Sequence, residues 1–91
     1  MVVKMFVIIT YDVGEKRVHK VCKKLREYLI WTQNSVFEGE ISKSLLMKCL
    51  YELELTMDKD EDSIYIYQVQ NPKNIKKQIF GQEKNFDELF I

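Results

Sequence analysis

Proline, glycine, cysteine and tryptophan are all scarce in this 91-residue chain. With one proline and three glycines, the chain has no composition typical of a flexible linker or a low-complexity segment. Because 46% of the residues are hydrophobic, the composition excludes a disordered chain. The length predicts a single domain, with a core over residues 1–70 and a C-terminal extension over 71–91. So short a chain has a thin core, and its surplus of apolar side chains favours an oligomer.

Long apolar runs are also missing. None approaches the roughly 20 residues that a membrane helix requires, and Lys4 interrupts the N-terminal run. We expect neither a membrane helix nor a signal peptide, because this run continues into strand-forming residues rather than a small-residue cleavage site. Cys22 and Cys49 have no second cysteine or histidine at metal-ligand spacing. We therefore expect reduced core thiols in a cytoplasmic protein, rather than a disulfide or a metal site.

The net charge is zero, but the charges are segregated. Residues 16–26 hold six cations and no acid, whereas residues 52–62 hold six acids and one lysine. A basic stripe of this kind binds polyanions even when the whole chain is neutral. The stripe therefore favours nucleic-acid binding through Lys16, Arg17, Lys20, Lys23 and Lys24. For any single lysine, a solvated helix face remains the simpler interpretation.

Hydrophobic periodicity predicts the order strand, helix, strand, strand, helix, strand. Residues 2–11 are apolar on both faces, which is typical of a central strand, and residues 63–69 form the last core strand. Helical repeats predict helices over 15–29 and 43–57, the second capped by Ser42 or Ser44. Residues 31–41 indicate two extended pieces with a bend or bulge at Glu38–Gly39. This order matches a ferredoxin-like βαββαβ sandwich of the α+β class.

A four-stranded sheet covered by only two helices has one bare face. The first and last core strands are apolar on both faces, so that bare face needs a cover. No helix of this short chain is left to supply it. We predict a sheet-to-sheet homodimer, with residues 86–91 of the tail reaching across to the other subunit.

Tyr11 and Asp12 end the first strand, just before the basic stripe. An acid in this position is commonly a loop residue or a helix cap. The alternative is a metal ligand, because a carboxylate oxygen suits Mg²⁺ or Mn²⁺. One acid per chain is a poor site, but a two-fold axis that joins two Asp12 side chains makes a divalent-metal site that can activate water against a phosphodiester.

Other candidates have simpler explanations. His19 is more readily an exposed helix residue than a general base, since the sequence names no partner for it. Trp31, Tyr65 and Tyr67 can stack on bases, although their strand spacing is more typical of core or interface. The acidic loop 58–62 is no calcium loop, because the glycine and the final glutamate of that motif are missing.

Three segments carry a resemblance to a known family. The strand ending in "YDV", the helix "KRVHKVCKKLREYL" and, above all, "WTQNSVFEGEIS" at residues 31–42 resemble the CRISPR-associated protein 2 family. The likeness runs from residue 4 to about residue 70, and the tail "IFGQEKNFDELFI" also looks like that family's closing segment. The resemblance implies a ferredoxin-like homodimer joined sheet to sheet, with an extra C-terminal strand that crosses to the other subunit.

The resemblance also implies a function. Members work with the integrase, CRISPR-associated protein 1, to capture short DNA duplexes and insert them as spacers, and several are Mg²⁺-dependent endonucleases on single-stranded RNA or double-stranded DNA. In the family motif the metal ligand falls on Asp12. Residues that support activity or nucleic-acid contact fall on Tyr11, Arg17, Ser35 and Phe37. Lysines stand here where many relatives have arginines, which favours nonspecific phosphate binding over a catalytic clamp.

Three functions are therefore open. The first is a dimeric scaffold that holds a DNA duplex for the integrase without chemistry of its own. The second is a magnesium-dependent endonuclease built on paired Asp12 carboxylates. The third is a toxin-like ribonuclease of the virulence-associated D type, which shares this fold.

Overall fold

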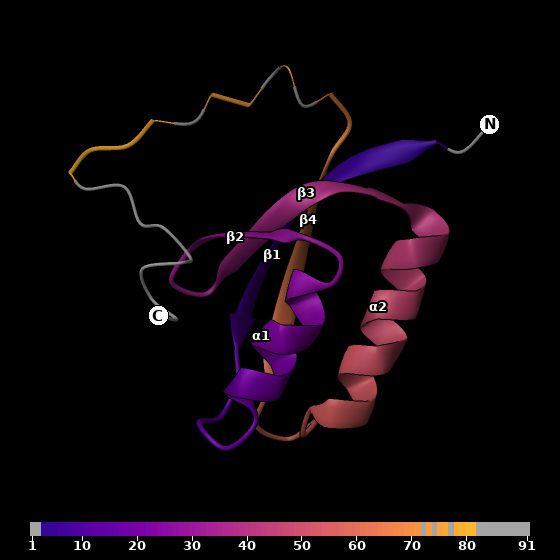
Figure 1. Cartoon of the computed structure of the whole chain (residues 1–91), viewed down its shortest axis with the longest axis vertical. Coiled ribbons are helices and arrows are strands. Elements are labelled where there is room, and N and C mark those ends of the chain that lie inside the picture. Colours follow the sequence, from indigo (N-terminus) through magenta and orange to yellow (C-terminus); the bar gives the residue numbers. More distant parts are fainter. Residues whose placement is uncertain (1–2, 72, 74, 77, 82–91) are drawn as a thin grey trace.

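The fold is a four-stranded sheet with two helices packed on one face (Figure 1). The computed structural model describes residues 3–71, 73, 75–76 and 78–81. In chain order the elements are β1 (Lys4–Asp12), α1 (Val18–Arg26), β2 (Ile30–Gln33), β3 (Val36–Ser42), α2 (Lys43–Thr56) and β4 (Ser63–Val69). All neighbouring strands are antiparallel, in the order β2-β3-β1-β4. The predicted ferredoxin-like α+β fold is confirmed.

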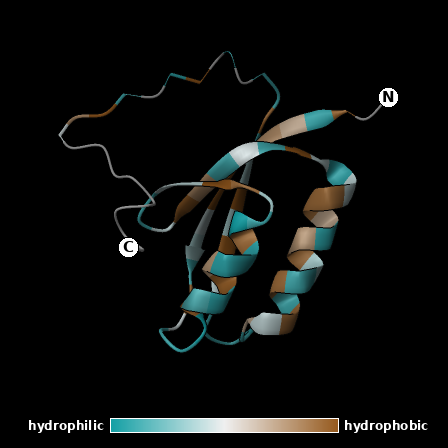
Figure 2. Ribbon diagram, viewed as in Figure 1, coloured by the Kyte–Doolittle hydropathy of each residue, from teal (hydrophilic) through white to brown (hydrophobic). Residues whose placement is uncertain are grey.

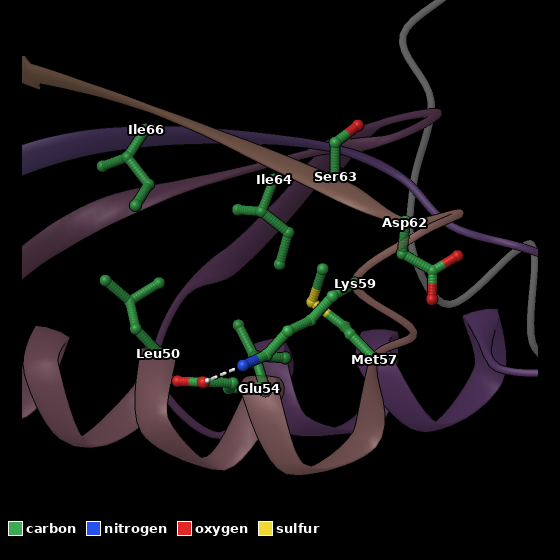
Figure 3. Close-up of a pocket in the computed structure, with 9 residues that line it drawn as sticks. Leu50, Glu54, Met57, Lys59, Asp62, Ser63, Ile64 and Ile66 are labelled. Carbon is green, nitrogen blue, oxygen red and sulfur yellow. Dashed lines mark ion pairs between the residues drawn. The ribbon is translucent and has the colours of Figure 1, made fainter.

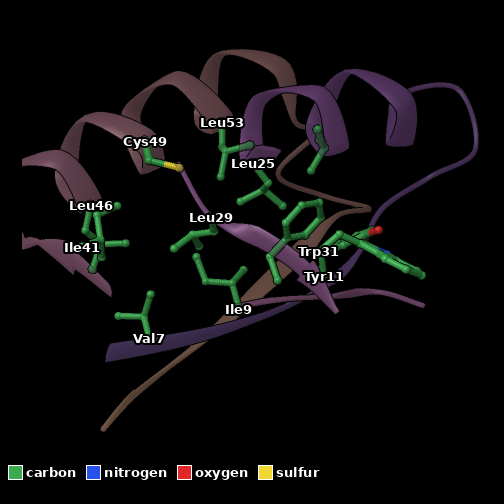
Figure 4. Close-up of a cluster of buried hydrophobic side chains, with 12 residues drawn as sticks. Val7, Ile9, Tyr11, Leu25, Leu29, Trp31, Ile41, Leu46, Cys49 and Leu53 are labelled. Carbon is green, nitrogen blue, oxygen red and sulfur yellow. The ribbon is translucent and has the colours of Figure 1, made fainter. Parts of the chain in front are cut away.

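The hydrophobic core lies between the helices and the sheet (Figure 4). Alternate residues of the central strand β1, namely Val7, Ile9 and Tyr11, are buried on the face that the helices cover. Leu25 of α1 and Leu53 of α2 meet them from above and are also buried. This alternation follows from the period-2 geometry of a strand, and it leaves the intervening residues of β1 on the opposite face.

Both helices form where the periodicity predicts them, but α1 is shorter than expected at each end. Residues 15–17 form a turn instead, in which the Arg17 and Val18 N–H groups both donate to the Gly14 carbonyl, at 2.9 and 3.0 Å. The helix α2 begins as predicted, because the Ser42 hydroxyl accepts a hydrogen bond of 3.3 Å from the Leu45 N–H. Neither helix of the described part is long and apolar enough to cross a membrane.

The predicted bend at Glu38–Gly39 is wrong, because β3 runs straight through it. The chain instead reverses at Asn34 and Ser35, with Asn34 in the left-handed region at φ 33°. Asparagine is one of the few residues besides glycine that adopt this conformation readily. Gly39 serves packing, since a Cβ there would lie 3.3 Å from Leu29 Cδ2.

The second face of the sheet is uncovered within the described part of the chain. Tyr65 and Tyr67 of β4 are 57% and 53% exposed, and they lie opposite Thr10 and Ile8 of β1 in the strand register. We call this surface the open face; it also contains the half-buried Phe6. The predictions for the crossing segment 86–91 and for most of the C-terminal extension lie outside the described residues.

Candidate nucleic-acid interface

Tyr11 and Asp12 are consecutive, but their side chains leave opposite faces of the sheet. Tyr11 is only 8% exposed on the helix side, where its hydroxyl lies 2.9 Å from Cys22 Sγ and donates to the Asn34 carbonyl at 3.2 Å. Burial, followed by the contact with Cys22, holds the pKa of Tyr11 well above its usual range. Tyr11 is thus a neutral phenol that joins α1 to the β2–β3 turn, and it does not reach the surface around Asp12.

Asp12 is exposed at the end of β1, paired in register with Ser63 of β4. Strand alternation assigns it to the open face, in line with Ile8 and Thr10. It makes no hydrogen bond or ion pair with any other described residue, so its oxygens are available to a ligand. No group of three or more His, Cys, Asp and Glu side chains in the described part can hold a metal. Within the described part of the chain Asp12 thus offers a single carboxylate, and a divalent cation would need further ligands beside it.

Arg17 is engaged with acids rather than directed at solvent. Its Nε lies 2.6 Å from Asp62 Oδ2, and its Nη2 lies 3.0 Å from Asp62 Oδ1 and 2.9 Å from Glu61 Oε2. The pKa of Arg17 is raised further by the hydrogen bonds to Asp62 and Glu61. Arg17 was predicted to contact nucleic acid, but in this structure it links the start of α1 to the start of β4.

Asp62 is the residue at this end of the sheet that sequence reasoning missed. Its side chain is 0% exposed, and its carboxylate also accepts hydrogen bonds from the Gly14 N–H at 2.8 Å and the Asp58 N–H at 2.9 Å. The Arg17 guanidinium, as the main cause, holds the pKa of Asp62 well below its usual range. The Asp62 carboxylate thus ties the loop that follows Asp12 to the start of β4.

Three lysines form an exposed ridge along α1 and the turn before it. Lys20 and Lys23 are three residues apart in α1, so they lie on one helical face, and Lys16 lies in the turn that leads into the helix. All three are exposed and form no ion pair with the described residues. We call them the lysine ridge, and a ridge of this kind suits the phosphates of a nucleic-acid backbone. His19 is exposed nearby, as its simpler interpretation predicted.

Lys24, the fifth predicted cation, joins α1 to α2 instead. Its Nζ lies 2.8 Å from Glu27 Oε2 and 2.9 Å from Glu52 Oε2, and these carboxylates raise its pKa. The Tyr28 hydroxyl also donates to Glu52, which raises the pKa of Tyr28 to about 12 and lowers that of Glu52. Lys24 is thus part of the contact between the helices rather than of the lysine ridge.

Ser35 and Phe37 occupy very different environments. Ser35 is exposed in the β2–β3 turn, and its carbonyl accepts a 3.0 Å hydrogen bond from the Tyr11 N–H. Phe37 is 0% exposed, with its ring centroid 6.0 Å from that of Tyr11. Trp31 is 8% exposed and belongs to the same core, as its strand spacing favoured. Phe37 and Trp31 therefore support the fold beneath the surface, where their rings are covered by other side chains.

An open pocket of about 360 Å³ lies between α2 and β4 (Figure 3). Its walls are largely apolar, with Leu50 and Leu53 on one side and Ile64 and Ile66 on the other. Its charged pair, Lys59 with Glu54, is joined at 3.1 Å. The pocket is on the helix side of the sheet, whereas Asp12 is on the open face, so the two do not form one site. Its largely apolar walls are also unsuited to phosphate.

Together the fold and these residues define a class: small ferredoxin-like proteins with an exposed acid at the end of the first strand and a basic first helix. The family described as CRISPR associated protein Cas2 matches residues 5–77. The chain belongs to this CRISPR-associated protein 2 family, as the resemblance of its motifs predicted.

Relatives cover nearly the whole chain. It is 51% identical over 79 residues to CRISPR-associated endoribonuclease Cas2 3 of Thermodesulfovibrio yellowstonii, covering 87% of this chain and 90% of the relative. It is 42% identical over 87 residues to CRISPR-associated endoribonuclease Cas2 of Dictyoglomus turgidum, covering 96% and 100%. A Cas2 crystal structure 43% identical in sequence superposes with a TM-score of 0.81, covering 90% of this chain and 92% of that chain. The crystal structure of Streptococcus pyogenes Cas2 at pH 6.5 gives 0.71 at 28% identity, covering 81% and 99%.

Proposed function

We propose that this chain is a nucleic-acid-binding component of CRISPR spacer acquisition that acts as a homodimer and has a magnesium-dependent endonuclease site. The observation that carries the proposal is the position of Asp12, which is exposed at the end of β1 on the open face, the face that also exposes Tyr65 and Tyr67. A surface of this kind is typical of a protein interface. Pairing two open faces about a two-fold axis buries Tyr65 and Tyr67 and brings two copies of Asp12 toward each other.

The roles of the chain's own residues follow from their surroundings. The lysine ridge binds the phosphodiester backbone, while Asp62 and Arg17 hold the loop beside Asp12 in place. Two Asp12 carboxylates would hold Mg²⁺ or Mn²⁺, and such an ion supplies a water of lowered pKa for attack on phosphorus. Relatives that are named endoribonucleases support single-stranded RNA as the first substrate to test, with double-stranded DNA as the second.

Cleavage assays test the nuclease. We expect wild type to cleave RNA or duplex DNA in the presence of Mg²⁺, and Asp12→Ala to lose at least about a hundredfold in rate, as removal of a group acting directly on the reaction does. Asp60→Ala is the matched control, because Asp60 is also an exposed acid at this end of the sheet. Equal rates for wild type and Asp12→Ala would remove Asp12 from the chemistry.

A scaffold function is the second candidate, and the lysine ridge favours it because the ridge is independent of Asp12. In that case the dimer holds a duplex for the integrase, CRISPR-associated protein 1, and Asp12→Ala leaves spacer integration intact. Changing Lys16, Lys20 and Lys23 to glutamate is expected to abolish integration by reversing the charge toward phosphate. Undiminished integration with this variant would contradict the scaffold.

A further inference from the structure

The outer surface of α2 carries a row of large apolar side chains. Met47, Tyr51 and Leu55 are 60%, 64% and 72% exposed. Their spacing of four residues places them in line on one face of the helix, over a length of about 12 Å. We call these three residues the α2 stripe.

The α2 stripe does not contribute to the core of its own chain. The inward residues of the helix, Leu46, Cys49 and Leu53, already fill the space above the sheet. In Figure 2 the ribbon of α2 is brown at intervals along its whole length, whereas the exposed side of α1 is mainly teal. Single exposed apolar residues are ordinary, but a continuous row on one element is typical of a contact surface.

The charges along α2 indicate what fits this surface. The N-terminal half carries the exposed Lys43 and Lys48, and the C-terminal half carries the exposed Glu54, whose ion pair with Lys59 is itself exposed and therefore weak. Glu52 is held by Lys24 and Tyr28 at the contact with α1 and takes no part in this pattern. A second helix of the same sequence is complementary in charge only when it runs antiparallel, so that Lys48 of each copy lies near Glu54 of the other. Antiparallel helix dipoles also attract, whereas parallel dipoles repel.

We propose that the α2 stripe is a contact surface for α2 of a second copy of this chain, packed antiparallel about a two-fold axis near Tyr51. Met47 and Leu55 are each four residues from Tyr51, so the axis sets Met47 of one copy beside Leu55 of the other. Such an interface uses the same patch on both copies, as two-fold symmetry requires. The contact is separate from the open face, because the helices and the open face lie on opposite sides of the sheet.

The size of the contact predicts its strength. A single face of a 14-residue helix is smaller than the roughly 800 Å² per partner of a standard stable interface. The contact is therefore weak, and it forms at high local concentration. Where open faces also pair, α2 contacts join the resulting dimers into larger assemblies, because each dimer then carries two α2 stripes.

Sedimentation velocity of the full chain over about 10 µM to about 1 mM tests the proposal, because weak contacts populate in this range. The variants are Tyr51→Glu at the centre of the α2 stripe and Tyr65→Glu on the open face, which alter side chains of similar exposure, 64% and 57%. We expect Tyr51→Glu to raise the dissociation constant of the concentration-dependent step at least about tenfold, because a carboxylate is buried there without a partner. Tyr65→Glu leaves this step and removes open-face pairing, so failure of the proposed function and failure of this inference are distinguishable.

A charge-exchange experiment tests the antiparallel arrangement. We expect Lys43→Glu/Lys48→Glu and Glu54→Lys each to associate more weakly than wild type, and a mixture of the two to associate more strongly than either alone. Circular dichroism spectra matching wild type would show that each variant is folded. Identical sedimentation of wild type and Tyr51→Glu at every concentration would overturn the proposal and leave the α2 stripe to a helix of a different protein.

Discussion

Arg17 and Asp62 are 45 residues apart in sequence, and the guanidinium Nε of the first lies 2.6 Å from a carboxylate oxygen of the second. Because the Asp62 side chain is 0% exposed, this ion pair is shielded from water on one side. A charge in such a place is costly when it loses its partner, whereas exposed ion pairs contribute little. The pair therefore secures the end of the sheet at which Asp12 lies.

Replacement of Asp62 by asparagine is expected to lower Tm by several degrees. The amide keeps the shape of the side chain but removes the charge opposite Arg17, and it cannot satisfy the Gly14 and Asp58 N–H groups as a carboxylate does. Thermal unfolding at neutral pH, followed by circular dichroism, measures the effect. Asp60→Asn is the control, because Asp60 is an exposed acid of the same loop, and an equal Tm for both variants would contradict the role of Asp62.

The same ion pair predicts a pH dependence of stability. The Arg17 guanidinium holds the pKa of Asp62 below its usual range in the folded protein, so the unfolded chain binds the proton more readily. The stabilisation is complete above the unfolded pKa of about 3.9, decreases progressively as the pH falls below it, and is lost only below the much lower pKa of the folded state. The Tm difference between wild type and Asp62→Asn should be constant from about pH 8 to about pH 5 and shrink below about pH 4. A difference that does not shrink at all between about pH 4 and about pH 2 counts against this ionisation.

The lysine ridge predicts how salt weakens nucleic-acid binding. Each neutralised phosphate of a duplex contributes about 0.9 to the slope of log K against log salt, so changing Lys16, Lys20 and Lys23 to glutamine should reduce that slope by about 3. Changing Lys43, Lys48 and Lys59 to glutamine removes the same charge from α2 and the loop after it. That control should leave the slope unaltered in fluorescence anisotropy titrations at several salt concentrations. An equal reduction by both sets would mean that only net charge matters.

Phe37 is expected to act on stability rather than on chemistry. Phe37→Ala leaves a cavity beside Tyr11 and should lower the free energy of unfolding by about 3–5 kcal/mol in urea titrations. Phe37→Leu keeps most of the volume and should cost less than about 1.5 kcal/mol. Nucleic-acid cleavage by folded Phe37→Leu should equal that of wild type at a temperature well below its Tm. Loss of cleavage in this folded variant would assign Phe37 a further role.

Local pattern was sufficient to predict most of the fold. The strand at 63–69 and the helix that begins after Ser42 form where periodicity and capping predict them. The boundary between β2 and β3 was predicted wrongly, because Gly39 was interpreted as a break in the strand. A glycine in a strand also permits close approach of a neighbour, here Leu29. Asn34, which takes the left-handed conformation, is a weaker signal in the sequence than glycine.

The site was less predictable, because its organisation rests on contacts between distant segments. The exposure of Asp12 follows from its position at the end of a buried strand. The shared face of Lys20 and Lys23 follows from helical spacing, whereas Lys16 lies in the turn before α1. The ion pair of Arg17 with Asp62 depends on where the loop before β4 lies, and no local sequence pattern specifies that position. Phe37 is in the core for a reason visible only in the register, where it pairs with Ile9.

The central position of β1 has a consequence for how the chain is made. Its neighbours in the sheet are β3 and β4, and the second of these ends at Val69. β1 is therefore synthesised first but cannot pair with β4 until most of the polypeptide has been made. Until then its apolar side chains remain uncovered. During that interval the unpaired edge and the apolar side chains of β1 favour aggregation of the nascent chain.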